Sequence, residues 1–357
     1  MTIPNPILLA QVTLACLLAL AALWWFVRGA RRWARRRSLR QCLEQTGLDE
    51  TPLPLLDEAF DQARQQLQGD GSARPQVLYH TPWVLFLGDA ASRVPDLLRA
   101  AGPATTAHGD ARDSFWRWWV MARVVAIEID ARLVEPEDEA GPPPARQLLA
   151  GWYRALLALA ERRGALPLDG IALCVDARSL LAGPQAVTAL AARLRQRADE
   201  ASQHLRLRLP TQVLVTGLDQ LPGYAAVREA LPADVLAQAV GFRVPAGTLV
   251  IIDDVLNDLS ERLRALQMAL LRQQADATGR RAVHEFFLHW LALQAGLGVF
   301  LKRLFAPATT PDAATYRLRG RGLYFVAAPA QERPPAFVLE LFTRFLPMER
   351  AFPGLRR

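Results

Sequence analysis

Residues 83–98, WVLFLGDAASRVPDLL, join an apolar run, a glycine, a short polar loop and the start of an amphipathic segment. This order predicts a buried strand, a turn at Gly88 and a helix, which is the outline of a phosphate-binding loop. A working loop reads G-x-x-x-x-G-K-[ST], where glycines admit the phosphates, lysine neutralises them and the hydroxyl binds Mg²⁺. Counted from Gly88, the second glycine is Arg93, the lysine is Val94 and the hydroxyl residue is Pro95.

The substitutions in this loop remove the groups that would hold a phosphate. Pro95 has no backbone N–H to offer at the helix start, although the first turn of a helix tolerates proline. The Arg93 side chain would fill the space that a glycine leaves open. We therefore interpret Gly88, Arg93, Val94 and Pro95 as vestigial phosphate-loop positions, and we expect a strand, a turn and a helix without a bound nucleotide.

The charge of the chain is concentrated in one segment. The 357 residues are 51% hydrophobic, enough for a folded protein, and carry a formal charge of +7 with a pI near 10.0. Residues 28–40 contain seven arginines, and without them 35 basic residues balance 35 acidic ones. A local excess of this kind argues against a basic groove for nucleic acid. The seven are Arg28, Arg31, Arg32, Arg35, Arg36, Arg37 and Arg40.

An apolar segment directly precedes these arginines. Residues 7–27 are apolar apart from Gln11 and Thr13, and as a helix they would extend about 31 Å, enough for a bilayer core. Trp24 and Trp25 stand where an aromatic belt would lie, and the positive-inside rule places the arginine side in the cytoplasm. The first six residues lack the side-chain cation of a signal peptide. We expect an uncleaved transmembrane helix at 7–27 and a periplasmic 1–6; a cleaved signal and a buried core helix are the alternatives.

The cysteines and histidines predict no metal site and no disulfide framework. The three cysteines at 16, 42 and 174 are too widely spaced for either. His284 and His289 lie five residues apart, whereas a zinc-binding helix of the protease type places its histidines four apart on one face. We expect both to be ordinary helix residues, and we expect no cofactor.

Short apolar runs then alternate with longer amphipathic ones. Buried strands are predicted at 84–88, 124–130, 170–176, 211–217 and 323–328. Helices are predicted at 147–165, 186–206, 255–274 and 285–305, the last as a buried helix in preference to a second membrane span. This alternation predicts an α/β fold with a mainly parallel sheet and helices on both faces. We expect a basic, helical connector at 28–74, an α/β domain at 75–255 and a mostly helical extension with one late strand at 256–357.

Beyond these patterns, seven segments match the family pattern of the IcmF/TssM proteins in order. The segments are TPWVLFLGDAASRVP at 81–95, RWWV at 117–120, EIDARL at 128–133, LPLDGIALCVDARSLL at 166–181, RLPTQVLVTGLDQLPGY at 208–224, VGF at 240–242 and LRGRGLYFVAAPAQE at 318–332. The chain thus resembles the cytoplasmic N-terminal domain of that family, inner-membrane components of type VI secretion systems. The resemblance implies a P-loop GTPase-like fold over roughly 75–357.

Two further nucleotide motifs depart from the family pattern. In the base-reading motif T-K-x-D, Thr216 and Asp219 remain but the lysine is Gly217, so Asp219 is a vestigial base-reading position and is expected at a turn or helix cap. The D-T-A-G motif aligns either with 128–131 or with 130–133, and in both cases its glycine is missing. Phosphoryl transfer depends on positioning and charge neutralisation, so these losses together predict a fold without the chemistry.

The resemblance implies a non-catalytic, membrane-anchored scaffold of a type VI secretion system in the bacterial inner membrane. It implies TssL-, TssK- and TssG-like partners, and we expect lipid contact through the seven arginines, with no nucleic acid and no small-molecule substrate. Family members usually have two entering helices and a large periplasmic region; we expect one helix here and no such region. The alternatives are a nucleotide-hydrolysing protein that uses Arg93, and a membrane-surface or nucleic-acid binder that uses the arginine segment.

Overall fold

The computed structural model describes residues 6–46, 58, 60–62, 64–65, 79–107, 115–136, 144–244, 252–307, 315–329 and 334–349. Within these ranges, the side chains of 6–10, 24–28, 31, 46, 105–107 and 144–146 are outside the description. Much of the connector expected at 28–74 is also outside the described residues.

The described strands form one eight-stranded sheet in the order β2-β3-β4-β1-β5-β6-β8-β7. Their bounds are β1 Trp83–Leu87, β2 Thr105–Ala107, β3 Trp116–Val120, β4 Val125–Ile129, β5 Gly170–Asp176, β6 Pro210–Thr216, β7 Val240–Arg243 and β8 Arg319–Phe325. The five strands from β4 to β8 in this order pair in parallel, whereas β3 and β7 run antiparallel to their neighbours β4 and β8. The prediction of an α/β fold with a mainly parallel sheet is confirmed.

Helices cover both faces of the sheet, and the side chains of β1 alternate between two cores. Trp83, Leu85 and Leu87 face the larger core, whereas Val84 and Phe86 face the smaller one. The larger core receives α5 (Pro144–Arg162) and α7 (Pro184–His204), and the smaller one receives α3 (Val94–Ala100) and the C-terminal turns η5 (Leu341–Phe345) and α13 (Leu346–Met348). Because β1 is buried on both faces, its residues form a continuous apolar run.

The C-terminal half adds helices beside the sheet and the strands β6, β8 and β7 within it. Short α6 (Ala177–Leu181), α8 (Tyr224–Ala230) and α9 (Ala233–Ala237) precede a hairpin of α10 (Ile252–Gln273) and α11 (Ala277–Leu304). In α11, Phe286, Phe287 and Trp290 are almost completely buried, so the expectation of a buried helix is confirmed. Strand β8 lies between β6 and β7 in the main sheet, and the expected boundary near 255 stays a prediction.

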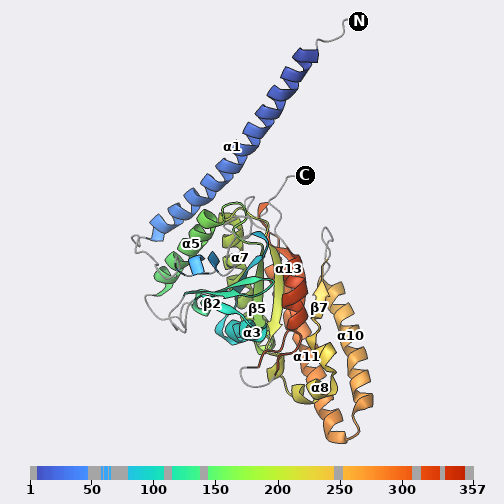
Figure 1. Ribbon diagram of the computed structural model, residues 1–357. Coiled ribbons are helices and arrows are strands. Elements are labelled where there is room, and N and C mark those ends of the chain that lie inside the picture. Colours follow the sequence, from blue (N-terminus) through green and yellow to red (C-terminus); the bar gives the residue numbers. More distant parts are fainter. Residues whose placement is uncertain are drawn as a thin grey trace.

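A single helix, α1 (Pro6–Thr46), extends away from the body (Figure 1). Residues 11–23 of this helix are exposed. Among the residues that the structure describes, no helix is long and apolar enough to span a bilayer. The span expected at 7–27 includes 7–10 and 24–27, whose side chains are outside the description, and it stays a prediction.

The C-terminal part of α1 packs against α5 and α7. Leu39 is completely buried in the larger core. Arg35 donates from Nη1 to the carbonyl oxygen of Gly164 at 3.1 Å, just beyond the C-terminus of α5, where a cation is favoured by the helix dipole. The hydroxyl of Ser38 lies 3.0 Å from Nδ1 of His204 at the end of α7. The helix that leaves the body is therefore fixed to it by packing and hydrogen bonds.

This docking corrects one part of the expected lipid contact. Arg35 is 5% exposed and bound to the body, so it is not available to a membrane surface. Arg40 is exposed but pairs with Glu161 of α5 at 3.2 Å. Consecutive residues of a helix lie on different faces of it, so some arginines of this segment contact the body and others face solvent.

Candidate functional site

The carboxyl end of β1 is the place in this sheet where a ligand would be expected. From β1 the chain continues to β4 on one side of that strand, and then to β5 on its other side. Such a reversal is a topological switch point, and open α/β sheets bind ligands in the crevice outside the carboxyl ends of strands there. The loop after β1, the start of α3 and the ends of β5 and β6 therefore form the candidate site.

The loop after β1 closes on itself through hydrogen bonds. It forms a single 3₁₀ turn, η2 (Ala90–Ser92), which Asp89 caps by accepting the backbone N–H of Ser92 at 3.0 Å. The hydroxyl of Ser92 donates to the Asp89 carbonyl oxygen at 2.6 Å, and the N–H of Arg93 donates to the Ala90 carbonyl oxygen at 3.2 Å. A phosphate-binding loop presents its N–H groups to the ligand. Here two of those groups are engaged within the loop.

Gly88 serves close packing in this loop. A Cβ atom at this position would lie 2.2 Å from Oγ of Ser92 and 3.0 Å from Cγ2 of Val94. The serine hydroxyl therefore occupies the space beside the glycine, where a phosphate loop would leave room for its ligand. Val94 is buried in the smaller core, and Pro95 lies in the first turn of α3, the position expected for it.

Arg93 connects the loop to the end of β6. Its backbone is left-handed, with φ of 49°. Its guanidinium pairs with Asp96 at 2.7 Å and lies 3.8 Å from Asp219 in η4 (Leu218–Gln220). The structure thus brings together a predicted phosphate-loop position and the predicted base-reading position, which are far apart in sequence. The positive charge that could have served a phosphate already has two carboxylate partners.

Gly217, which stands at the lysine position of the base-reading motif, is confined by a neighbouring carboxylate. Its φ is +74°, and a Cβ atom there would lie 2.1 Å from Oδ1 of Asp176 at the end of β5. Asp176 accepts the N–H of Arg178 through Oδ2 and so caps α6, while its Oδ1 is buried without a hydrogen-bond partner. A lysine side chain at 217 would require both a strained backbone and displacement of Asp176.

Two carboxyl groups of the site, those of Asp89 and Asp176, have raised pKa values. Burial raises the pKa of Asp89, and the nearby charge of Asp176 raises it further. Burial likewise raises the pKa of Asp176, with a smaller contribution from Asp219. Arg93 itself is already paired with the carboxylates of Asp96 and Asp219. An added phosphate would therefore meet like charge here, which is unfavourable in a partly desolvated site.

The raised pKa of Asp176 predicts a dependence of stability on pH. The folded state holds the proton more tightly than the unfolded one, so this stabilising contribution is complete below the ordinary value of 3.8 and is lost as the pH rises through the raised folded pKa. Asp176→Asn keeps a capping oxygen and removes the charge. The free energy of unfolding of this variant minus that of the wild type, both measured by urea denaturation, is expected to increase as the pH rises. Asp234→Asn, at an exposed position in α9, is the control; an equal pH dependence in both variants would contradict the expectation.

The second motif is also occupied by structural contacts. Glu128, the next-to-last residue of β4, is buried and bound by Arg117 at 2.9 Å and by Nε1 of Trp119 at 2.8 Å, both from β3. Burial raises the pKa of Glu128 despite these partners. Asp130 caps the turn η3 (Ala131–Leu133) by accepting the N–H of Arg132 at 2.9 Å. In one alignment of the motif the carboxylate is Glu128, which binds β3, and in the other it is Asp130, which caps η3.

No group of three or more potential metal-ligating side chains occurs among the described residues. His284 lies 3.1 Å from Nε2 of Gln267, and Nδ1 of His289 lies 2.9 Å from the carbonyl oxygen of Glu285. Both histidines thus have contacts within the α10–α11 hairpin. Cys174 is buried in β5, where burial raises the pKa of its thiol.

Sequence reasoning missed a buried ion pair at the opposite, amino-terminal end of the strands. Arg163, completely buried after α5, donates from Nη1 to Oδ2 of Asp169 at 2.7 Å. The same carboxylate oxygen accepts the N–H of Trp83 at 2.9 Å, so the pair joins the starts of β1 and β5. The isolated RR and LPLD segments gave no signal of this contact, because exposed arginines and aspartates are far more common.

The structure defines an α/β domain in which the loop after β1 is closed by its own hydrogen bonds and ion pairs. A family model for the IcmF-related N-terminal domain matches residues 147–353, more than half of the chain. The chain therefore belongs to the IcmF-related family. It is 27% identical over 296 residues to the type VI secretion system component TssM1 of Pseudomonas aeruginosa. The match covers 78% of this chain and 26% of that relative, so the chain spans about a quarter of the relative's length.

Proposed function

We propose that this protein is a non-catalytic, membrane-anchored assembly component of a type VI secretion system in the bacterial inner membrane. The observation that carries this proposal is family membership, together with the similarity to a protein that is itself a type VI secretion component. The proposed partners are other components of the apparatus, of the TssL, TssK and TssG types. Fold alone does not establish such a role, and a test in cells is therefore essential.

The proposed domain is a GTPase-like fold at 75–255 that has lost its nucleotide, with a mostly helical extension at 256–357. The position of the β1 loop at a topological switch point supports a descent from nucleotide-binding folds. The internal hydrogen bonds of the loop and the two carboxylate partners of Arg93 support the loss of binding. Phosphoryl transfer requires free donors and positive charge at this place. We therefore disfavour the nucleotide-hydrolysing alternative.

The proposed anchor is the N-terminal part of α1, as a single transmembrane helix at 7–27 with residues 1–6 in the periplasm. Its described residues support this proposal, because large apolar side chains are exposed around the helix. They are Val12, Leu14, Leu17, Leu18, Leu20 and Leu23, each 54–64% exposed. The same part of α1 extends away from the body (Figure 1). A helix that is apolar all round requires an apolar environment. The arginines that follow orient the body toward the cytoplasm.

The test of the proposed function is secretion in a bacterium that carries this chain beside a type VI apparatus. Deletion of the gene is expected to stop the release of a type VI effector into the medium, and the wild-type chain is expected to restore it. Arg93→Ala is expected to restore secretion as well, because the proposal assigns no nucleotide chemistry to this residue. Continued secretion after deletion, with the apparatus otherwise intact, would contradict the proposed function.

A further inference from the structure

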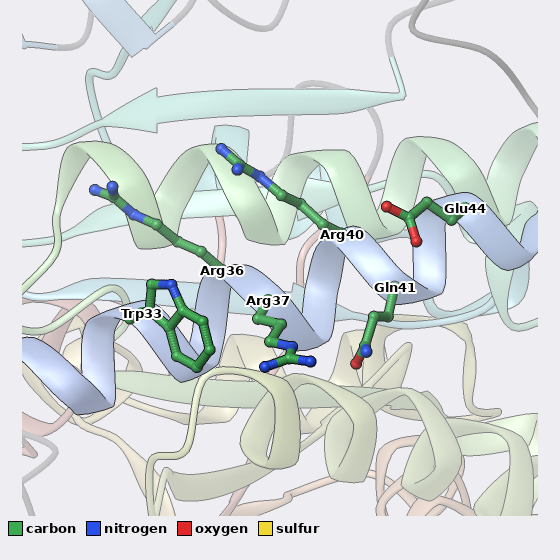
Figure 2. Close-up of a pocket in the computed structure, with 6 residues that line it drawn as sticks. All are labelled: Trp33, Arg36, Arg37, Arg40, Gln41 and Glu44. Atoms are coloured by element: carbon green, nitrogen blue, oxygen red, sulfur yellow. The ribbon is translucent and has the colours of Figure 1, made fainter.

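The outward face of α1 carries a shallow hollow just beyond the proposed anchor. Figure 2 shows the six side chains that line it, all from α1: Trp33, Arg36, Arg37, Arg40, Gln41 and Glu44. At 100° per residue these positions cover a stripe of the helix about 140° wide. The stripe lies opposite Arg35 and Leu39, which face the body.

The chemistry of this stripe is that of an anion-binding surface with an aromatic edge. The guanidinium of Arg37 lies 5.0 Å from the ring centre of Trp33, whose side chain is 61% exposed. Arg36 is half-buried and Arg37 is exposed, and within the described part of the chain neither forms an ion pair with an acidic side chain, whereas Arg40 pairs with Glu161. A planar guanidinium can donate two parallel hydrogen bonds to two oxygens of one phosphate. Tryptophan is enriched at the boundary between the membrane and water.

We propose that Trp33, Arg36 and Arg37 form a cradle for the headgroup of an anionic phospholipid. This inference rests on the membrane anchoring proposed above and assigns to it a specific lipid contact. Arg40 contributes less, because Glu161 already neutralises part of its charge. The arginines on the body face of α1 serve a different purpose, as the bond from Arg35 to Gly164 demonstrates.

The position of the stripe along α1 favours a lipid over another anion. The helix is continuous from the exposed apolar residues to the stripe, so Arg36 and Arg37 lie about 14–15 Å beyond residue 27 along the axis. The headgroup layer extends about 5–8 Å beyond the hydrocarbon, and its surface potential reaches about 8 Å further. Helix side chains slant toward the N-terminus, which brings both guanidinium groups closer to the bilayer. The stripe is thus within reach of the leaflet that α1 would enter.

Ligand-dependent stabilisation of the full chain in a non-ionic detergent tests the cradle. Phosphatidylglycerol is expected to raise the apparent unfolding temperature by a few degrees, whereas phosphatidylcholine and inorganic phosphate leave it unchanged. Arg36→Gln/Arg37→Gln is expected to abolish most of this shift. The control, Arg264→Gln/Arg272→Gln, removes the same charge from exposed positions of α10 and is expected to keep it.

Three outcomes would overturn the inference without touching the proposed secretion role. The first is an equal phosphatidylglycerol shift in wild type and in Arg36→Gln/Arg37→Gln. The second is an equal shift with inorganic phosphate, which would identify a free anion as the ligand. The third is loss of a secretion partner from co-purified complexes of this variant while its lipid shift is unchanged, which would make the stripe a protein-binding surface. Effector release by the same variants is measured separately, so failure of the lipid contact and failure of the secretion role are distinguishable.

Discussion

Replacing Arg163 with methionine is expected to lower the free energy of unfolding by about 3–5 kcal/mol, the usual cost of removing one partner from a buried ion pair. Methionine fills much of the same volume, so the loss arises chiefly from the Asp169 carboxylate that stays buried without its cation. The guanidinium also lies 4.8 Å from the ring centre of Trp83, and this cation–π contact is lost as well. Urea denaturation followed by circular dichroism measures the change.

A second substitution separates the stranded charge from the lost packing. Arg163→Met/Asp169→Asn removes the carboxylate charge but keeps a side-chain oxygen that accepts the N–H of Trp83. The double variant is expected to recover more than half of the loss, because no unpaired charge is left buried. A single variant that loses less than about 1 kcal/mol would show that the pair contributes no more than an exposed one.

Leu17→Arg/Leu18→Arg is expected to release the chain from membranes. Both side chains are more than 60% exposed on α1, and each arginine near the centre of a membrane helix costs about 2.5–3.5 kcal/mol of insertion free energy. If the two costs add, the total of about 5–7 kcal/mol shifts the insertion equilibrium by more than a thousandfold. The measurement is the fraction of chain that stays with membranes after alkaline extraction.

The control for this variant is Leu17→Ile/Leu18→Ile, which preserves apolarity at the same positions and is expected to stay in the membrane fraction. Full retention of the arginine variant after alkaline extraction would contradict the proposed anchor. Both variants leave the packing of Leu39 and the bond of Arg35 intact, so the fold of the body is expected to be unchanged.

Much of the fold could be predicted because its central strands are buried on both faces. Continuous apolar runs at 84–88, 170–176 and 211–217 correspond to β1, β5 and β6 within one or two residues. The antiparallel strands were not predicted. In β3, polar Arg117 interrupts three tryptophans, and in β7 the four residues are too short for a period and include Gly241.

Strand β8 began four residues earlier than expected, at Arg319. Its first residues are polar or glycine, which the apolar pattern excluded. The side chains of Gln212 and Tyr324 lie close to Gly322. A Cβ atom at this position would be 2.3 Å from the amide oxygen of Gln212, so the position requires glycine. The contact with Gln212 comes from the neighbouring strand β6, so the residues around Gly322 in the sequence could not predict it.

The position of the candidate site could be predicted from the sequence, but the contacts among its side chains could not. The missing lysine and hydroxyl were visible in the loop itself. The ion pair between Arg93 and Asp219 joins positions more than a hundred residues apart, and the hydroxyl of Ser92 beside Gly88 depends on the turn geometry. For the same reason, the division of the arginine segment between body and solvent required the position of α5.

Calorimetric titration of the full chain with ATP and GTP, in a non-ionic detergent with Mg²⁺, tests the account most directly. The loop N–H groups of Ser92 and Arg93 donate internally, and the guanidinium of Arg93 pairs with Asp96 and Asp219. We expect no saturable heat for either nucleotide up to millimolar concentration. Saturable binding that Arg93→Ala abolishes would mean that the loop holds a nucleotide by a different set of contacts, and it would contradict the account of a chain that has kept the fold and lost the ligand.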